Sequence, residues 1–116
     1  MHGVPPDLPL GPFVGDTLEQ ICISEFQLQF QFHAAGTISV EGDWELSDSS
    51  AQILDSSQEH KNRLVYRLHL LLGQAVGNFE IRPPKSFTLH FSSGHTLTIF
   101  DSSERYESFS VNGVYI

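Results

Sequence analysis

Hydrophobic and polar residues alternate most strictly between positions 26 and 41. Phenylalanine and leucine first alternate with Gln27, Gln29 and Gln31, and after an Ala-Ala-Gly turn Ile38 and Val40 alternate with polar residues. A period of two predicts a β-hairpin with one buried face. Residues 87–99 repeat the pattern around a Ser-Gly turn, so we expect a second hairpin there.

Shorter runs of the same period predict further strands at 18–24, 44–46, 76–81, 106–111 and 114–116. Pro83 and Pro84 end the strand at 76–81, because proline has no N–H to donate to a sheet. Residues 1–14 are rich in proline and glycine, which predicts an extended arm.

Residues 56–72 carry the pattern of an amphipathic helix. Ser56 and Glu59 have the spacing of a capping box, and Gly73 can take the left-handed conformation that ends a helix. The apolar residues of the segment fall on one stripe at helical spacing: Leu64, Val65, Leu68, Leu71 and Leu72.

The two halves of the chain resemble each other. Gly15, Leu18 and Ile21 recur at the same spacing as Gly73, Val76 and Phe79, and the hairpin patterns follow in the same order. We therefore predict two similar β-meanders, at 15–46 and 73–113, joined by the helix. The expected fold class is α+β, in one domain spanning 1–116. One antiparallel sheet and two packed half-sheets of pseudo-twofold character both fit this pattern.

Charge and cysteine content limit the kinds of partner and the cellular compartment that we expect. The chain has 14 acidic and 6 basic residues, for a formal net charge of −8. This charge disfavours nucleic acid and speeds encounter with a basic partner, although it is also explained by solubility alone. A single cysteine, Cys22, suits a reducing compartment, and the longest apolar run, Leu70–Leu72, is too short to span a bilayer. With no secretory signal visible, we predict a cytoplasmic protein without a membrane partner.

Motifs for chemistry are missing from the sequence. The six histidines lack the spacing of zinc ligands, and neither a G-x-S-x-G elbow nor a phosphate-binding glycine loop is present. His90 and His95 flank one hairpin turn, where polar strand positions explain them better than a metal. We therefore predict no catalytic residue, no metal and no cofactor.

Acidic residues gather after each hairpin, with an aromatic residue beside each group. The first group surrounds Trp44 and Glu45, and the second, which includes Asp101, surrounds Tyr106 and Glu107. Solvated turns are one interpretation of these acids, and two equivalent acidic rims that receive Lys or Arg from a partner are the other. Trp44, Glu45, Tyr106 and Glu107 are nevertheless the candidate binding residues, because aromatic side chains with acidic neighbours are plausible interface anchors. For Trp44, a place in the core is the competing interpretation.

Three motifs in the second half resemble a group of small bacterial proteins of unknown function. The motifs are L-L-G-x-x-V at 71–76, F-x-x-G-x-x-L-x-I at 91–99 and Y-E-[SA]-[WF] at 106–109. Some members of that group are thought to be immunity proteins that act beside secreted toxins. The resemblance implies no catalytic residues.

The leading hypothesis is thus a non-enzymatic cytoplasmic binding protein that neutralises a basic toxin. A ligand-binding or enzymatic domain with a pocket between sheet and helix is one alternative. A homodimer, or a larger homo-oligomer, joined through a strand edge or the Gln27-Gln29-Gln31 face is the other.

Overall fold

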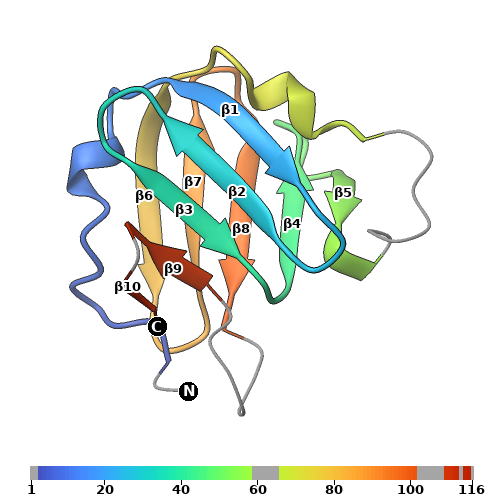
Figure 1. Ribbon diagram of the computed structural model, residues 1–116. Coiled ribbons are helices and arrows are strands. Elements are labelled where there is room, and N and C mark those ends of the chain that lie inside the picture. Colours follow the sequence, from blue (N-terminus) through green and yellow to red (C-terminus); the bar gives the residue numbers. More distant parts are fainter. Residues whose placement is uncertain (1–2, 59–65, 102–108, 113, 116) are drawn as a thin grey trace.

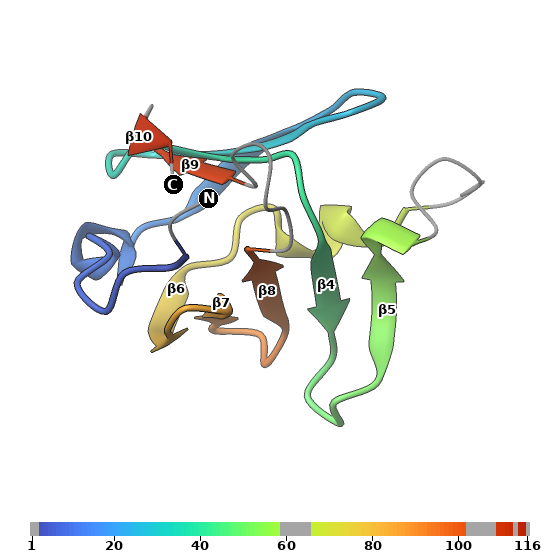
Figure 2. The same cartoon turned by 90° about the horizontal axis from the view of Figure 1, so that it is seen from below.

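Two five-stranded antiparallel sheets lie face to face in the computed structural model, which describes residues 3–58, 66–101, 109–112 and 114–115 (Figures 1 and 2). The front sheet of Figure 1 has the order β1 (Leu18–Ile23), β2 (Leu28–Phe32), β3 (Thr37–Val40), β9 (Phe109–Val111) and β10 (Val114–Tyr115). The back sheet has the order β5 (Ile53–Ser56), β4 (Trp44–Ser47), β8 (Thr96–Phe100), β7 (Ser86–Phe91) and β6 (Val76–Arg82). Two short 3₁₀ helices, η1 (Gly11–Phe13) and η3 (Leu68–Leu71), precede β1 and β6.

The predicted α+β class is wrong, because the described chain contains strands and 3₁₀ turns but no α-helix. In the segment predicted as a helix, 56–72, Ser56 ends β5 and 68–71 form only the short η3. Leu68 and Leu71 are buried, but Leu72, on the same predicted stripe, is 43% exposed. A spacing of three fits a single 3₁₀ turn as well as one side of an α-helix. The rest of the predicted helix, 59–65, lies outside the described residues.

The two halves exchange strands. After β3 the chain crosses to the back sheet, where β4 pairs with β8. After β8 it crosses to the front sheet, where β9 pairs with β3. Each sheet is therefore a three-stranded meander from one half, completed by a two-stranded hairpin from the other half. Of the two arrangements that the duplication allowed, the structure has the two packed sheets.

Reciprocal hydrogen bonds reveal the same pseudo-twofold relationship. The Gly15 N–H donates to the Val76 carbonyl at 2.7 Å, and the Gly73 N–H donates to the Leu18 carbonyl at 2.8 Å. Gly15 and Gly73 have φ values of +86° and +80°, a region that favours glycine. The glycines shared by the two halves therefore fix one local backbone shape twice, where the start of each half meets the other.

One apolar core fills the space between the sheets. The inward residues of β2 and β3 are buried, as are those of β7 and β8. Phe13 packs edge to face on Phe32 with ring centroids 5.0 Å apart, and Phe87 packs similarly on Phe109 at 4.9 Å. Such edge-to-face pairs add to the stabilisation that burial provides.

The predicted N-terminal arm contributes to this core. Val4, Leu8, Leu10 and Phe13 are all at most 4% exposed. The Val4 N–H also donates to the carbonyl of residue 84 at 2.9 Å. Residues 3–13 run beside β6, which places them along one side of the sandwich (Figures 1 and 2). Apart from η1, proline and glycine let this segment follow the surface without regular structure while its spaced apolar side chains point inward.

Strand β5 is missing from the sequence-based prediction. Its pattern is the reverse of an ordinary buried face, because Ile53 is 55% exposed whereas Asp55 is 1% exposed. The Asp55 carboxylate accepts a hydrogen bond from the backbone N–H of Arg67. Asp55 therefore ties the edge strand to the segment that leads into η3, and a buried acid also discourages edge-to-edge pairing.

Candidate functional site

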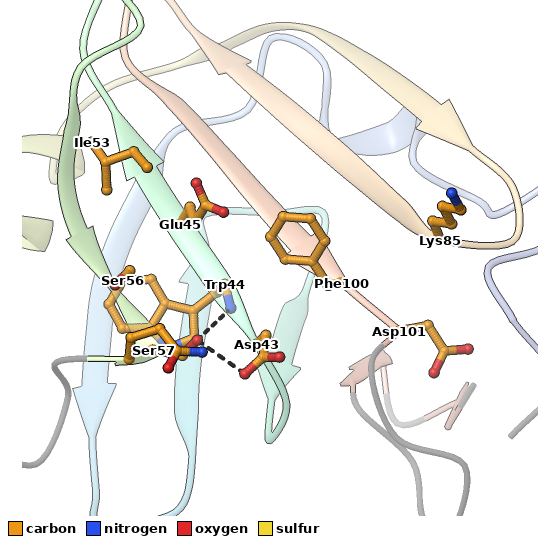
Figure 3. A pocket seen from close by; sticks show the side chains of 10 residues that line it. Asp43, Trp44, Glu45, Ile53, Ser56, Ser57, Lys85, Phe100 and Asp101 are labelled. Atoms are coloured by element: carbon orange, nitrogen blue, oxygen red, sulfur yellow. Dashed lines mark hydrogen bonds between the residues drawn. The ribbon is translucent and has the colours of Figure 1, made fainter.

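A hollow of about 420 Å³ opens at the end of the back sheet where β4 begins and β8 ends (Figure 3). The end of β5 forms part of its lining. The rest is formed by carboxylates, one ammonium group and two aromatic residues: Asp43, Glu45, Asp101, Lys85, Trp44 and Phe100. Among the described residues, the lining holds three carboxylates and one ammonium group but no histidine or cysteine. The excess of carboxylates over ammonium groups suits the binding of a cation.

Strand exchange brings the hollow together from distant parts of the sequence. Because β4 pairs with β8, the segment that enters β4 meets the segment that leaves β8. The Phe100 N–H donates to the Asp43 carbonyl at 3.0 Å, and the Asp101 N–H donates to the Lys85 carbonyl at 2.8 Å. Acids from the two sequence groups, one after each hairpin, therefore share a single site.

Asp43 is positioned by the residues around it. The Ser57 hydroxyl donates to Asp43 Oδ1 at 3.1 Å and accepts from the Trp44 N–H at 3.2 Å (Figure 3). The hydroxyl thus links the carboxylate to the first backbone N–H of β4. This arrangement fixes the Asp43 carboxylate at the N-terminal end of β4.

Glu45 has a different environment. It lies on the outer face of β4, opposite Thr98 on one side and Ser56 on the other, and it is half-buried. Within the described part of the chain its carboxylate makes no hydrogen bond and no ion pair. Partial burial weakens hydration of a carboxylate, so an unpaired acid in this position favours a cation brought by a ligand.

Phe100 supplies an aromatic ring on the same outer face. Its neighbour Ile99 points into the core and is fully buried, whereas Phe100 is half-buried and lies opposite Ser86. Figure 3 shows the ring between Glu45, which points toward it, and Lys85. Lys85 is exposed at the β6–β7 turn and forms no ion pair with any described residue. The ring therefore separates an unpaired carboxylate from an unpaired ammonium.

The four predicted binding residues have different places. Glu45 lines the hollow, and Trp44 is 3% exposed and pairs with Ile99, as a core residue does. Tyr106 and Glu107 lie outside the described residues. In the sheet ladders the counterpart of Trp44 is Phe109, since Phe109 pairs with Val40 as Trp44 pairs with Ile99.

Sequence reasoning missed Phe100 and Lys85 as site residues. A signal for Phe100 was present, because Ile99 and Phe100 are adjacent in a strand that otherwise alternates. Two neighbouring large apolar residues cannot both face the core of a strand. No comparable signal marks Lys85, which reaches the hollow only because the β6–β7 turn lies beside the end of β8.

The glutamines of the first hairpin lie elsewhere. Gln29 and Gln31 are half-buried on the outer face of the front sheet, where Gln31 Nε2 donates to Cys22 Sγ at 3.6 Å. Gln27 Nε2 donates to Glu41 Oε1 at 3.1 Å. These contacts hold the face together within one chain.

Two kinds of feature are absent from the described residues. No three His, Cys, Asp or Glu side chains come close enough to hold a metal ion there. In the same residues, no helix has the length and apolar character needed to cross a membrane. Comparisons of the chain with known protein families, with characterised proteins and with solved structures find no match.

Proposed function

We propose that the protein is a non-enzymatic binding domain that holds a basic protein partner at the hollow beside β4 and β8. The observation that carries this proposal is the half-buried Glu45 carboxylate, which has no partner in the described chain and points toward the Phe100 ring. A cationic side chain from a partner would pair with this carboxylate and cover the ring.

Electrostatics supports a protein partner of opposite charge. The net charge of −8 attracts a basic surface over a long range, and Asp43 and Asp101 concentrate negative charge at the hollow. Complementary charge raises the association rate, and aromatic residues at the centre of an interface supply much of the affinity. The hollow combines both properties.

Neutralisation of a basic toxin is the most concrete form of this function. The resemblance of the motifs at 71–76, 91–99 and 106–109 to proteins thought to confer immunity supports it. An acidic surface that docks on a basic enzyme blocks substrate access without any chemistry of its own.

Co-expression with the products of the flanking genes tests the proposal. We expect one of these products to be basic and toxic, and to form a stable complex with this chain. Glu45→Lys should weaken the complex at least about 10-fold, because it places like charges in the interface. Glu25→Lys is the matched control, since Glu25 is exposed in the β1–β2 turn of the other sheet. If no flanking product is toxic or forms a complex, or if both variants weaken the complex equally, the proposal is wrong.

A further inference from the structure

The pseudo-twofold relationship isolates what is special about the hollow. Phe100 follows Ile99 in β8 as Glu41 follows Val40 after β3, and Glu45 follows Trp44 as Ser110 follows Phe109. Equivalent positions in the two halves of a duplicated fold pair with equivalent strands and pack against the same core. A difference between them that the core does not require therefore points to function.

The front-sheet counterpart has neither a ring nor an unpaired acid at these two positions. Glu41 is bonded to Gln27 at 3.1 Å, and Ser110 is 2% exposed. On the back sheet the same two positions hold the Phe100 ring and the unpaired Glu45 carboxylate, and a hollow lies over them. The fold is built once without a ring and an unpaired acid at these positions, so their presence in the back sheet is not a structural need.

We infer that the hollow receives an arginine side chain of the partner, with its guanidinium group stacked on Phe100 and hydrogen-bonded to Glu45. This inference rests on the proposed function and specifies the group that is recognised. A planar guanidinium uses its face for the ring and its edge for the carboxylate at the same time. Glu45 points toward the ring from the neighbouring strand, which is the placement that such a pair needs (Figure 3).

Lysine fits the same place less well. Its ammonium is a compact, strongly hydrated charge that gains little from the face of a ring in a site open to water. Lys85, on the far side of Phe100, repels any cation, but the delocalised guanidinium spreads its charge over a larger surface than an ammonium does. Phosphate-bearing ligands are excluded by the three carboxylates that line the hollow.

Binding of two small probes to the whole ¹⁵N-labelled chain tests the inference. N-acetyl-arginine methylamide and N-acetyl-lysine methylamide are titrated separately, and amide shifts are followed by NMR. We expect the arginine probe to bind roughly 2- to 5-fold more tightly, the range that a cation–π contact at an exposed site provides. Its largest shifts should fall at Glu45, Thr98 and Phe100.

Two variants separate the ring from the charge. Phe100→Leu keeps an apolar side chain but removes the aromatic face, so the arginine probe should fall to the affinity of the lysine probe. Glu45→Gln should weaken both probes, whereas Glu25→Gln, which changes net charge equally on the other sheet, should weaken neither. A well-dispersed NMR spectrum shows that each variant is folded.

Equal binding of the two probes, an arginine preference that survives Phe100→Leu, or no binding of either probe overturns the inference. Failure of the proposed function would give a different set of results. If the flanking-gene complex forms and depends on Glu45 while the probes show no arginine preference, only the inference is lost. If the arginine preference is found but no complex forms, the toxin partner is lost and the guanidinium site remains.

Discussion

Asn112 Oδ1 accepts a hydrogen bond from the backbone N–H of Thr37 at 2.8 Å, and so it joins the β9–β10 hairpin to the β2–β3 turn. Asn112 Nδ2 donates to the Ala35 carbonyl at 2.9 Å, on the same turn. One side chain thus holds together two segments far apart in sequence, one from each half of the molecule. Asn112 has φ +53°, a left-handed conformation that asparagine tolerates better than most residues.

Asn112→Ala should lower the free energy of unfolding by about 1–3 kcal/mol, from two lost hydrogen bonds and a left-handed alanine. Asn112→Gly loses the same bonds but relieves the backbone, so it should cost less. Urea denaturation of both variants measures the difference. Equal losses of unfolding free energy in the two variants would mean that the left-handed backbone at position 112 does not affect stability.

Gly36→Ala should be more damaging than an ordinary turn substitution. Gly36 has φ +119°, and an added Cβ would lie 1.7 Å from Asn112 Oδ1. Combining Gly36→Ala with Asn112→Gly removes the side-chain clash but leaves the backbone strain. The double variant should therefore lose less free energy of unfolding than the sum of the single losses. Strict additivity would show that the two residues do not meet.

Trp44 is the single tryptophan of the chain and is 3% exposed, so its fluorescence reports the core. We expect a blue-shifted emission that moves to the red on unfolding. Trp44→Ala should cost about 3–5 kcal/mol of stability, as large-to-small core changes do. Trp44→Phe should cost less, because the counterpart position already holds Phe109. Emission typical of a solvated indole in the native protein would contradict the core assignment.

Acid should weaken the protein through Asp16. Hydrogen bonds from the Ala35 and Ala34 N–H groups hold the pKa of the Asp16 carboxyl below its ordinary value of 3.8. An acid whose pKa is lower in the folded state stabilises the fold above its unfolded pKa, and this contribution is lost as the pH falls through the folded pKa.

Urea denaturation between about pH 5 and pH 2 should therefore show a smaller acid-dependent loss in Asp16→Asn than in the wild type. The exposed Glu25→Gln is the control and should follow the wild-type curve. If the stability of Asp16→Asn falls as steeply with acid as that of the wild type, the hydrogen bonds between Asp16 and the β2–β3 turn do not contribute to the pH dependence.

His33 should titrate above its ordinary value. Its Nδ1 lies 3.0 Å from Glu19 Oε2, and this hydrogen bond with the charge of Glu19 raises the pKa of His33 above 6.5. The pairing stabilises the fold below the unfolded pKa, and the effect is lost as the pH rises through the folded pKa. NMR titration of the His33 ring measures the pKa, which should return toward 6.5 in Glu19→Gln. A His33 pKa that does not change in this variant would rule out the pairing.

Local pattern determined most of the strands. The alternation from Leu28 onward and that at 87–99 became β2–β3 and β7–β8, because a period of two leaves a strand only one way to bury its apolar side. Phe26, the first apolar residue of the pattern, lies before β2 and is 70% exposed. The repeated glycine and apolar spacing also identified the duplication. Both signals lie within short stretches of chain, which is why sequence alone was enough.

Tertiary structure decided the fold class. Leu68 and Leu71 satisfy helical spacing, yet the segment after them pairs with the start of the other half through Gly73 and Val76, which limits η3 to one short 3₁₀ helix. Strand β5 buries an acid where the pattern asks for an apolar residue, because Asp55 has a backbone partner that only the fold provides.

The candidate site was decided in the same way. Glu45 and the acidic character of Asp43 and Asp101 were visible in the sequence, but nothing there shows that the segments after the two hairpins meet. They meet because the strands that follow each meander, β4–β5 and β9–β10, belong to the opposite sheet. Sequence by itself determined most of the strands and the positions of the charged residues. The long-range pairing of β4 with β8 alone decided which of those charges share a hollow with Phe100.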